Sequence, residues 1–214
     1  MLIHQESNAM KKINIAINTK NTFLRESLVS MINELIRHNR HLHVTFSYKH
    51  NDFSDKDMII AEVLPGEIYL CNTSIKNRKT GSSVIILHSY DPLPEKERIV
   101  NCLKGVTFVS IKSVPINKMF DIIAGELKKS ENLPPTPTAT SELICSNCPH
   151  KMLSRSQVAV ASGIIHGFDI GKISALHNVT PKTIVWHKSK IMEKYRLNNN
   201  YDFFQFINLL KERW

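Results

Sequence analysis

The chain has 214 residues, of which 42% are hydrophobic, and its 28 Lys and Arg against 19 Asp and Glu give a formal charge of +9. This length accommodates one large domain or two modest domains, each with a buried core. No apolar run approaches the ~20 residues that span a bilayer, and the N-terminal residues lack the apolar centre of a secretory signal. We therefore expect a cytoplasmic protein without a membrane partner, and the four scattered cysteines exclude a disulfide framework.

Short apolar runs alternate with amphipathic stretches in the first 129 residues. A helix is predicted over 23–38, where apolar residues follow the 3, 4, 7 spacing of one face, and a last helix carries Phe120, Ile123 and Leu127 at the same kind of spacing. Strands separated by helices indicate an α/β domain with a parallel sheet. The strands are predicted at 13–17, 43–48, 67–71, 83–89 and 106–111.

A proline-rich segment follows this domain. Residues 130–143 contain three prolines within a Ser/Thr-rich run, which predicts a linker over 130–150 between domains at 11–129 and 151–214. The second domain holds ten Lys and Arg against four Asp and Glu, a charge of +6, so the remainder of the chain carries only +3. A compact basic block favours a polyanionic partner such as nucleic acid, because neutralising phosphates releases counterions.

The second domain carries signals for helices only. Ser154, Asp169 and Thr180 are each suited to cap a helix, and a final helix is predicted over 201–213. The helix that Thr180 opens is preceded by a short helix and a turn, the helix-turn-helix arrangement that lays its second helix in a DNA major groove. We therefore expect a small all-α module that binds DNA.

The helix over 180–195 has two different faces. Ile184, Ile191 and Tyr195 recur at spacings of seven and four and share one face. The opposite face is polar and mostly basic. We expect it to contact DNA, and a solvated basic surface is the alternative interpretation. Its members are Lys182, Trp186, Ser189, Lys190 and Glu193.

Residues 153–197 resemble the LuxR-type (NarL/FixJ) helix-turn-helix, in which the part that corresponds to "VTPKTIVWHKSKIMEKY" is the DNA-reading helix. The sequence departs from the family pattern at Ser156, Gln157, Lys172 and Val185, and Val185 stands where the family commonly directs a lysine at DNA. The resemblance implies the fold more strongly than it implies the operator sequence. The matching positions are Leu153, Ser154, Val160, Gly167, Ile173, Thr183, Ile184, His187, Ile191 and Lys194.

The helix pattern and the resemblance together give a set of candidate DNA contacts. We expect lysines to lie on phosphates and Trp186 to contact a thymine methyl or a sugar edge, although Trp186 and His187 could instead pack against the domain. Lys188 lies nearer the packed face than the groove face. The expected partners are double-stranded promoter DNA and a second subunit, either an identical chain or another LuxR-type regulator. The candidate contacts are Thr180, Lys182, Thr183, Trp186, His187, Lys188 and Lys190.

An α/β domain ahead of such a module resembles the receiver domain of two-component regulators. There the first strand ends in two acids that hold Mg²⁺, the third ends in the phosphorylated aspartate, and a lysine closes the fifth. Here Ile17 and Asn18 stand at the acid pair, Asn72 at the phosphoacceptor, and Lys112 matches the lysine. Asparagine has no carboxylate to accept a phosphoryl group, and isoleucine offers no oxygen to Mg²⁺. We expect a degenerate receiver, most similar to that of the RcsA-type auxiliary regulators.

The remaining motifs indicate neither a cofactor nor catalysis. Cys145, Cys148 and His150 have a spacing that can ligate zinc, but no second pair accompanies them, so free thiols and no metal are expected. No Ser-His-Asp order, glycine-rich phosphate loop or carboxylate pair stands out, and we expect no enzymatic activity. The alternative functions are a protein-only adaptor that titrates a response regulator and a regulator that senses a small molecule.

Overall fold

The structure, a computed structural model, describes residues 10–37, 39, 41–48, 52–89, 99–131 and 148–212. These residues form two compact units. The sheet unit is drawn from Met1–Glu62, Asn72–His88 and Gly105–Ile144, and the helical unit from Val63–Cys71, Ser89–Lys104 and Cys145–Trp214. None of the helices in the described ranges is long and apolar enough to cross a membrane.

A five-stranded sheet forms the centre of the sheet unit. All neighbouring strands are parallel, in the order β2-β1-β3-β4-β5, so the carboxyl ends of all five strands lie at one edge. Burial on both faces explains why residues 58–61 of β3 and 84–87 of β4 are continuously apolar rather than alternating. The strands are β1 (Lys11–Asn18), β2 (Leu42–Ser47), β3 (Met58–Glu62), β4 (Ser83–His88) and β5 (Thr107–Ser110).

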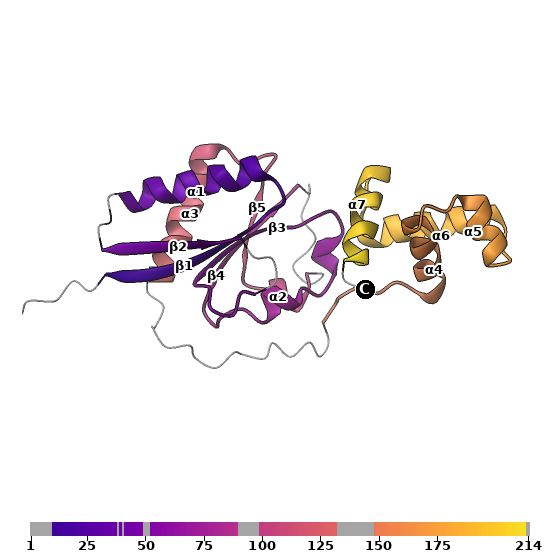
Figure 1. Ribbon diagram of the computed structural model, residues 1–214, viewed down its shortest axis with the longest axis horizontal. Coiled ribbons are helices and arrows are strands. Elements are labelled where there is room, and N and C mark those ends of the chain that lie inside the picture. The colour runs from indigo at the N-terminus through magenta and orange to yellow at the C-terminus, as the bar shows by residue number, and fades with distance from the viewer. Residues whose placement is uncertain are drawn as a thin grey trace, which may run out of the picture. The chain divides into compact units, whose positions relative to one another are not determined.

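Two long helices cover one face of this sheet. Figure 1 shows α1 (Thr22–Arg37) and α3 (Ile116–Glu131) on the same side, where they also contact each other. Their apolar stripes pack against the strands, with Ile32 and Ile123 fully buried. The α/β fold class is confirmed, and α3 continues to Glu131, past the boundary we placed at 129. The rest of the predicted linker over 132–147 lies outside the described residues.

The predicted strand over 67–71 is wrong. Glu67–Tyr69 is a short 3₁₀ helix, η1, and the third strand is β3, which the sequence reading overlooked. Gly66 at φ 82° starts the turn, and the Glu67 carboxylate accepts a hydrogen bond from the Leu64 backbone N–H at 2.9 Å. This side-chain bond stabilises a local turn in place of a strand ladder.

A buried carboxylate joins α3 to the sheet. Glu126 accepts hydrogen bonds from the hydroxyl groups of Ser83 on β4 and Thr107 on β5, and from the Lys129 ammonium at 2.7 Å. Burial raises the pKa of Glu126, but the hydrogen bonds from Lys129, Ser83 and Thr107 outweigh it, so the pKa lies below the ordinary value of 4.5. Glu126 is therefore ionised at neutral pH and holds α3 against β4 and β5.

Four helices follow in the helical unit: α4 (Arg155–Ile165), α5 (Ile170–Leu176), α6 (Pro181–Tyr195) and α7 (Asn200–Lys211). Their core contains Val160, Ile173 and Ile184, one residue from each of the first three helices. Gly163 lets α4 and α5 approach closely, because a Cβ at this position would lie 2.8 Å from Cγ1 of Ile173. The predicted all-α module is confirmed.

Candidate nucleic-acid interface

The turn between α5 and α6 is held by backbone hydrogen bonds. Asn178 takes the left-handed conformation at φ 51°, which asparagine tolerates better than most residues, and the Val179 N–H donates to the Ser174 carbonyl at 3.0 Å. α5 and α6 both pack on α4, and they contact each other as well. The helix-turn-helix is therefore a rigid arrangement with α6 as its second helix.

The first turn of α6 is capped by a threonine. Thr180 Oγ1 accepts from the Thr183 backbone N–H at 3.2 Å, the two hydroxyl oxygens lie 3.0 Å apart, and Pro181 occupies the first helical position. Val179 precedes the cap and Ile184 follows four residues after it, the spacing of a hydrophobic staple. The remaining N–H groups of this turn give the helix end a partial positive charge that favours phosphate.

One face of α6 is exposed along the whole helix. Trp186 is 55% exposed and Val185 is 45% exposed, whereas Ile184 and Ile191 on the other side are buried. The exposed residues recur at offsets of 3, 4, 7 and 11 from the first, which places them on one contiguous stripe. They are Lys182, Val185, Trp186, Ser189 and Glu193.

The lysines of α6 have different surroundings. Lys182 is exposed and forms no ion pair with any described residue. Lys190 pairs with Glu193 at 2.6 Å, but both side chains are well exposed, so this pair is weak and free to exchange for a phosphate. Lys188 donates to Asn200 Oδ1 at 2.8 Å and lies 5.1 Å from the Phe203 ring centroid. Its ammonium therefore joins α6 to α7.

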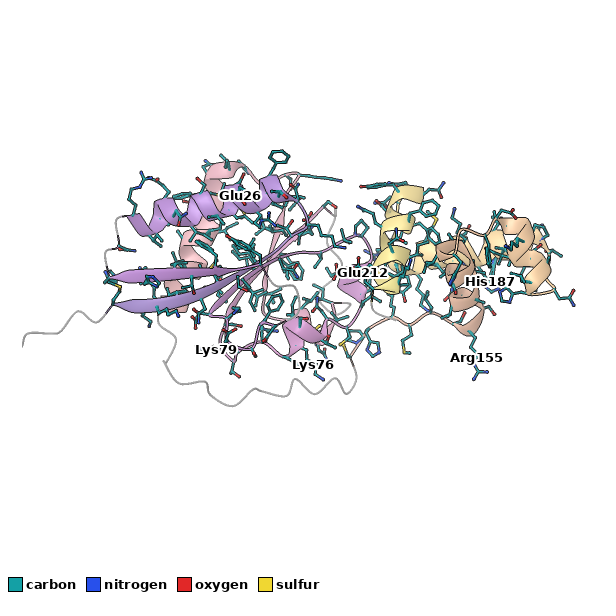
Figure 2. The ribbon with its side chains drawn as sticks, viewed as in Figure 1. Glu26, Lys76, Lys79, Arg155, His187 and Glu212 are labelled. Atoms are coloured by element: carbon teal, nitrogen blue, oxygen red, sulfur yellow. The ribbon has the colours of Figure 1, made fainter. Side chains whose placement is uncertain are left out.

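Trp186 and His187 lie next to each other at the middle of the helix. Their ring centroids are 5.0 Å apart in an edge-to-face arrangement, with an interplanar angle of 73°. His187 is half-buried, and Figure 2 shows it among the packed helices of the helical unit. The histidine thus supports one edge of the indole while the rest of the Trp186 ring stays open to solvent.

The end of α6 is fixed by a buried tyrosine. The Tyr195 hydroxyl donates to the Lys151 carbonyl at 3.0 Å, and its ring lies 4.3 Å from that of Phe206 on α7. Burial raises the pKa of Tyr195 to about 12, so the hydroxyl remains a neutral donor at physiological pH. α6 is consequently anchored at its C-terminal end and exposed along its outer stripe.

The carboxyl edge of the sheet is where the receiver resemblance places the acid pair and the phosphoacceptor, which we expected this sequence to lack. Ile17 is buried and Asn18 is half-buried at the end of β1, and Asn18 pairs in register with Ala61 of β3. The only carboxylate that ends a strand in the described sheet is that of Glu62, and the Thr19 hydroxyl donates a hydrogen bond to it. Glu62 was not predicted from the sequence, although the apolar run "MIIA" before it indicates a central strand.

Asn72 does not end the third strand, which corrects its predicted position. It lies beyond η1 and caps the short helix α2 (Thr73–Lys76), where its Oδ1 accepts from the Ile75 N–H at 3.0 Å. The error follows from the wrong strand at 67–71. Lys112 comes shortly after β5 and is exposed.

The Cys-X-X-Cys motif is described only in part. Cys145 lies outside the described residues, and the Cys148 sulfur accepts from the Asn101 N–H at 3.3 Å within the helical unit. His150 is exposed. Among the described residues no group of three or more His, Cys, Asp or Glu is placed to hold a metal ion.

Comparisons with known proteins identify the architecture. No family profile matches the chain, and no characterised protein matches it in sequence. The structure of RcsB from Salmonella enterica serovar Typhimurium, bound to promoter P1flhDC in the presence of phosphomimetic BeF₃⁻, covers 92% of this chain and 98% of its own at 17% identity and a TM-score of 0.50. The chain shares the fold of this RcsB structure. It comprises a receiver-like α/β domain with a five-stranded parallel sheet, followed by a helical domain that contains a helix-turn-helix.

Two further structures cover nearly the whole chain at lower structural similarity. One shows two RcsB dimers bound to two parallel DNAs, with 17% identity over 92% of this chain and 98% of that chain and a TM-score of 0.49. The other is full-length FixJ from B. japonicum, with 18% identity over 90% of this chain and 94% of that chain and a TM-score of 0.34. At such identities the likeness concerns the fold alone.

Proposed function

We propose that this chain is a sequence-specific DNA-binding transcription regulator that inserts α6 into the major groove. The observation that supports this most directly is the exposed stripe of α6, which starts at a capped helix end beside the unpaired Lys182. Both features attract phosphate, and they belong to the part of the chain that carries a charge of +6. Helix, cap and charge thus favour the same polyanionic partner.

The candidate contacts divide by role in this proposal. Thr180 and Thr183 present the helix end to a phosphate, and Lys182 and Lys190 neutralise phosphates. Trp186 contacts the groove floor, and His187 orients it. Lys188, which bonds Asn200, serves mainly to hold α7 against α6.

We propose that the functional unit is a dimer, formed by two copies of the chain or by this chain and another LuxR-type regulator. α7 buries Phe203 and Phe206 in its own domain but exposes Tyr201 and Phe204 on its other side. Exposed aromatic side chains at helical spacing are typical of a protein interface. One RcsB structure holds two dimers on two parallel DNAs, and we extend a dimeric arrangement to this chain.

We also propose that the sheet unit is a degenerate receiver of the RcsA type, acting independently of aspartyl phosphorylation. Ile17 and Asn18 occupy the end of β1, and Glu62 at the end of β3 is a glutamate already bonded by Thr19. The proposed receiver runs from residue 11 to the end of α3, a linker follows up to 150, and the DNA-binding domain covers 151–214.

Acetyl phosphate tests this second proposal. Incubation of the intact protein with acetyl phosphate and Mg²⁺ is expected to leave its mass and its DNA affinity unchanged, because the strand ends offer neither an aspartate nor a pair of acids. Intact-mass spectrometry and DNA titration provide the two readings. Stoichiometric gain of one phosphoryl group at residue 62, 72 or a neighbour is the result that would overturn the degenerate-receiver assignment.

A genomic pull-down tests DNA binding and dimerisation together. The intact protein is expected to enrich discrete fragments of sheared bacterial DNA, and the sites should contain two related half-sites about one helical turn apart if a dimer binds. Lys182→Met removes one charge from the stripe and should abolish most of the enrichment.

Lys211→Met is the matched control, because it removes the same charge from the end of α7 in the same domain. Its enrichment should equal that of the natural chain. An equal loss of DNA enrichment in both variants would indicate that α6 acts only as a general basic surface. Capture of a partner regulator without any enriched DNA would favour the protein-only adaptor.

A further inference from the structure

Two apolar side chains occupy the middle of the exposed stripe of α6. Val185 and Trp186 stand three and four residues after Lys182, and Ser189 follows one turn later. The apolar requirement of the domain core is already met by Ile184 and Ile191, which are buried on the other face. Core packing therefore does not account for Val185 and Trp186.

The chemistry of α6 restricts what it can read in a major groove. Arginine or lysine recognises guanine, and asparagine or glutamine recognises adenine, through bidentate hydrogen bonds to the base edge. The sequence of 181–195 contains no Arg, Asn or Gln. Lysine, threonine, serine and histidine remain, together with the apolar pair, and apolar side chains recognise the C5-methyl group of thymine.

The position of the indole suits such a contact. The edge-to-face contact with half-buried His187 holds one side of the Trp186 ring, so that less side-chain freedom is lost on binding. Lys182 lies one turn before Trp186 and can hold the adjacent phosphate. Glu193, whose charge disfavours DNA, lies at the far end of the stripe and is paired with Lys190.

We propose that Val185 and Trp186 are specificity residues that select thymine through its C5-methyl group. This inference rests on the proposed function, since it names the bases read by the same helix. It also gives a physical meaning to valine at 185, where the family resemblance leads us to expect a lysine: a phosphate or guanine contact is replaced by a methyl contact.

The experiment begins with selection of binding sites from duplexes that contain a random 20-base-pair segment, using the intact protein. The preferred duplex is then synthesised with single thymines replaced by deoxyuridine, which removes only the methyl group. At one or two positions per half-site the natural chain should lose about fourfold in affinity, the factor for burying one methyl-sized group. Trp186→Ala and Val185→Ala should each reduce the difference in affinity between the thymine and uracil duplexes.

Met152→Ala removes an exposed apolar side chain outside α6 and should keep the full preference for thymine. A selected site that tolerates uracil at every position overturns the inference while DNA binding stands. The same holds for a uracil penalty that persists unchanged in both the Trp186 and the Val185 variants. Failure to select any sequence refutes the proposed function and the inference with it.

Discussion

At the scale of single residues, side chains of the same type have different surroundings on one helix. Lys182 faces solvent, Lys190 shares an exposed ion pair, and Lys188 bonds Asn200 of α7. Sequence periodicity placed Lys188 nearer the packed face and Lys182 on the outer face, as the structure has them. The partners Asn200 and Glu193 decide how available each ammonium is. Asn200 could not be identified beforehand because it belongs to another helix.

The buried carboxylate of Glu126 should make the sheet unit sensitive to acid. Its pKa is below the ordinary glutamate value of 4.5, so its contribution to stability is fully present above that value and is lost as the pH falls through the folded pKa. Glu126→Gln should lower stability at pH 7 by about 1–2 kcal/mol, because charge-assisted hydrogen bonds are lost. Thermal unfolding followed by circular dichroism between pH 7 and pH 3 measures the difference.

The two melting curves should converge in acid, where the natural side chain is itself protonated. Glu34→Gln is the control, since Glu34 forms only an exposed ion pair with Arg37 on α1 and its loss should change little at any pH. A constant difference between Glu126→Gln and the natural chain over the whole pH range would contradict the linkage.

At the scale of elements, the helices were easier to predict than the strands. Ser154, Asp169 and Thr180 each cap a helix as predicted, because a cap depends on a side chain and a backbone N–H only a few residues apart. The apolar stripes of α1 and α3 were equally clear, since a stripe repeats over several turns.

The strand order could not be settled by apolar runs alone. The runs at 58–62 and 67–71 are both short and buried, so periodicity does not separate a strand from a 3₁₀ turn. Pro65 and Gly66 between them carried the missing signal, because they start a turn. This one misassignment moved the expected phosphoacceptor from the end of β3 to Asn72.

At the scale of the whole molecule, the net positive charge is concentrated in the C-terminal domain. The C-terminal 64 residues hold two thirds of the net charge, +6 of +9, and include the exposed stripe of α6. This charge asymmetry could be predicted from the sequence, because it requires only a count of the charged residues. The apolar character of the stripe centre became clear only when Val185 was found exposed beside Trp186.

The salt dependence of DNA binding tests the central claim most directly. For the intact protein on a duplex recovered from genomic DNA, log K should fall with log[salt] with a slope of about −4, if Lys182 and Lys190 of two subunits each neutralise one phosphate. Lys182→Met should weaken binding and make the slope shallower by about one for each subunit. Fluorescence anisotropy between 50 and 300 mM salt, with Lys211→Met as the reference, measures both quantities. An affinity that does not change with salt, or a Lys182→Met slope equal to that of the natural chain, would contradict the account.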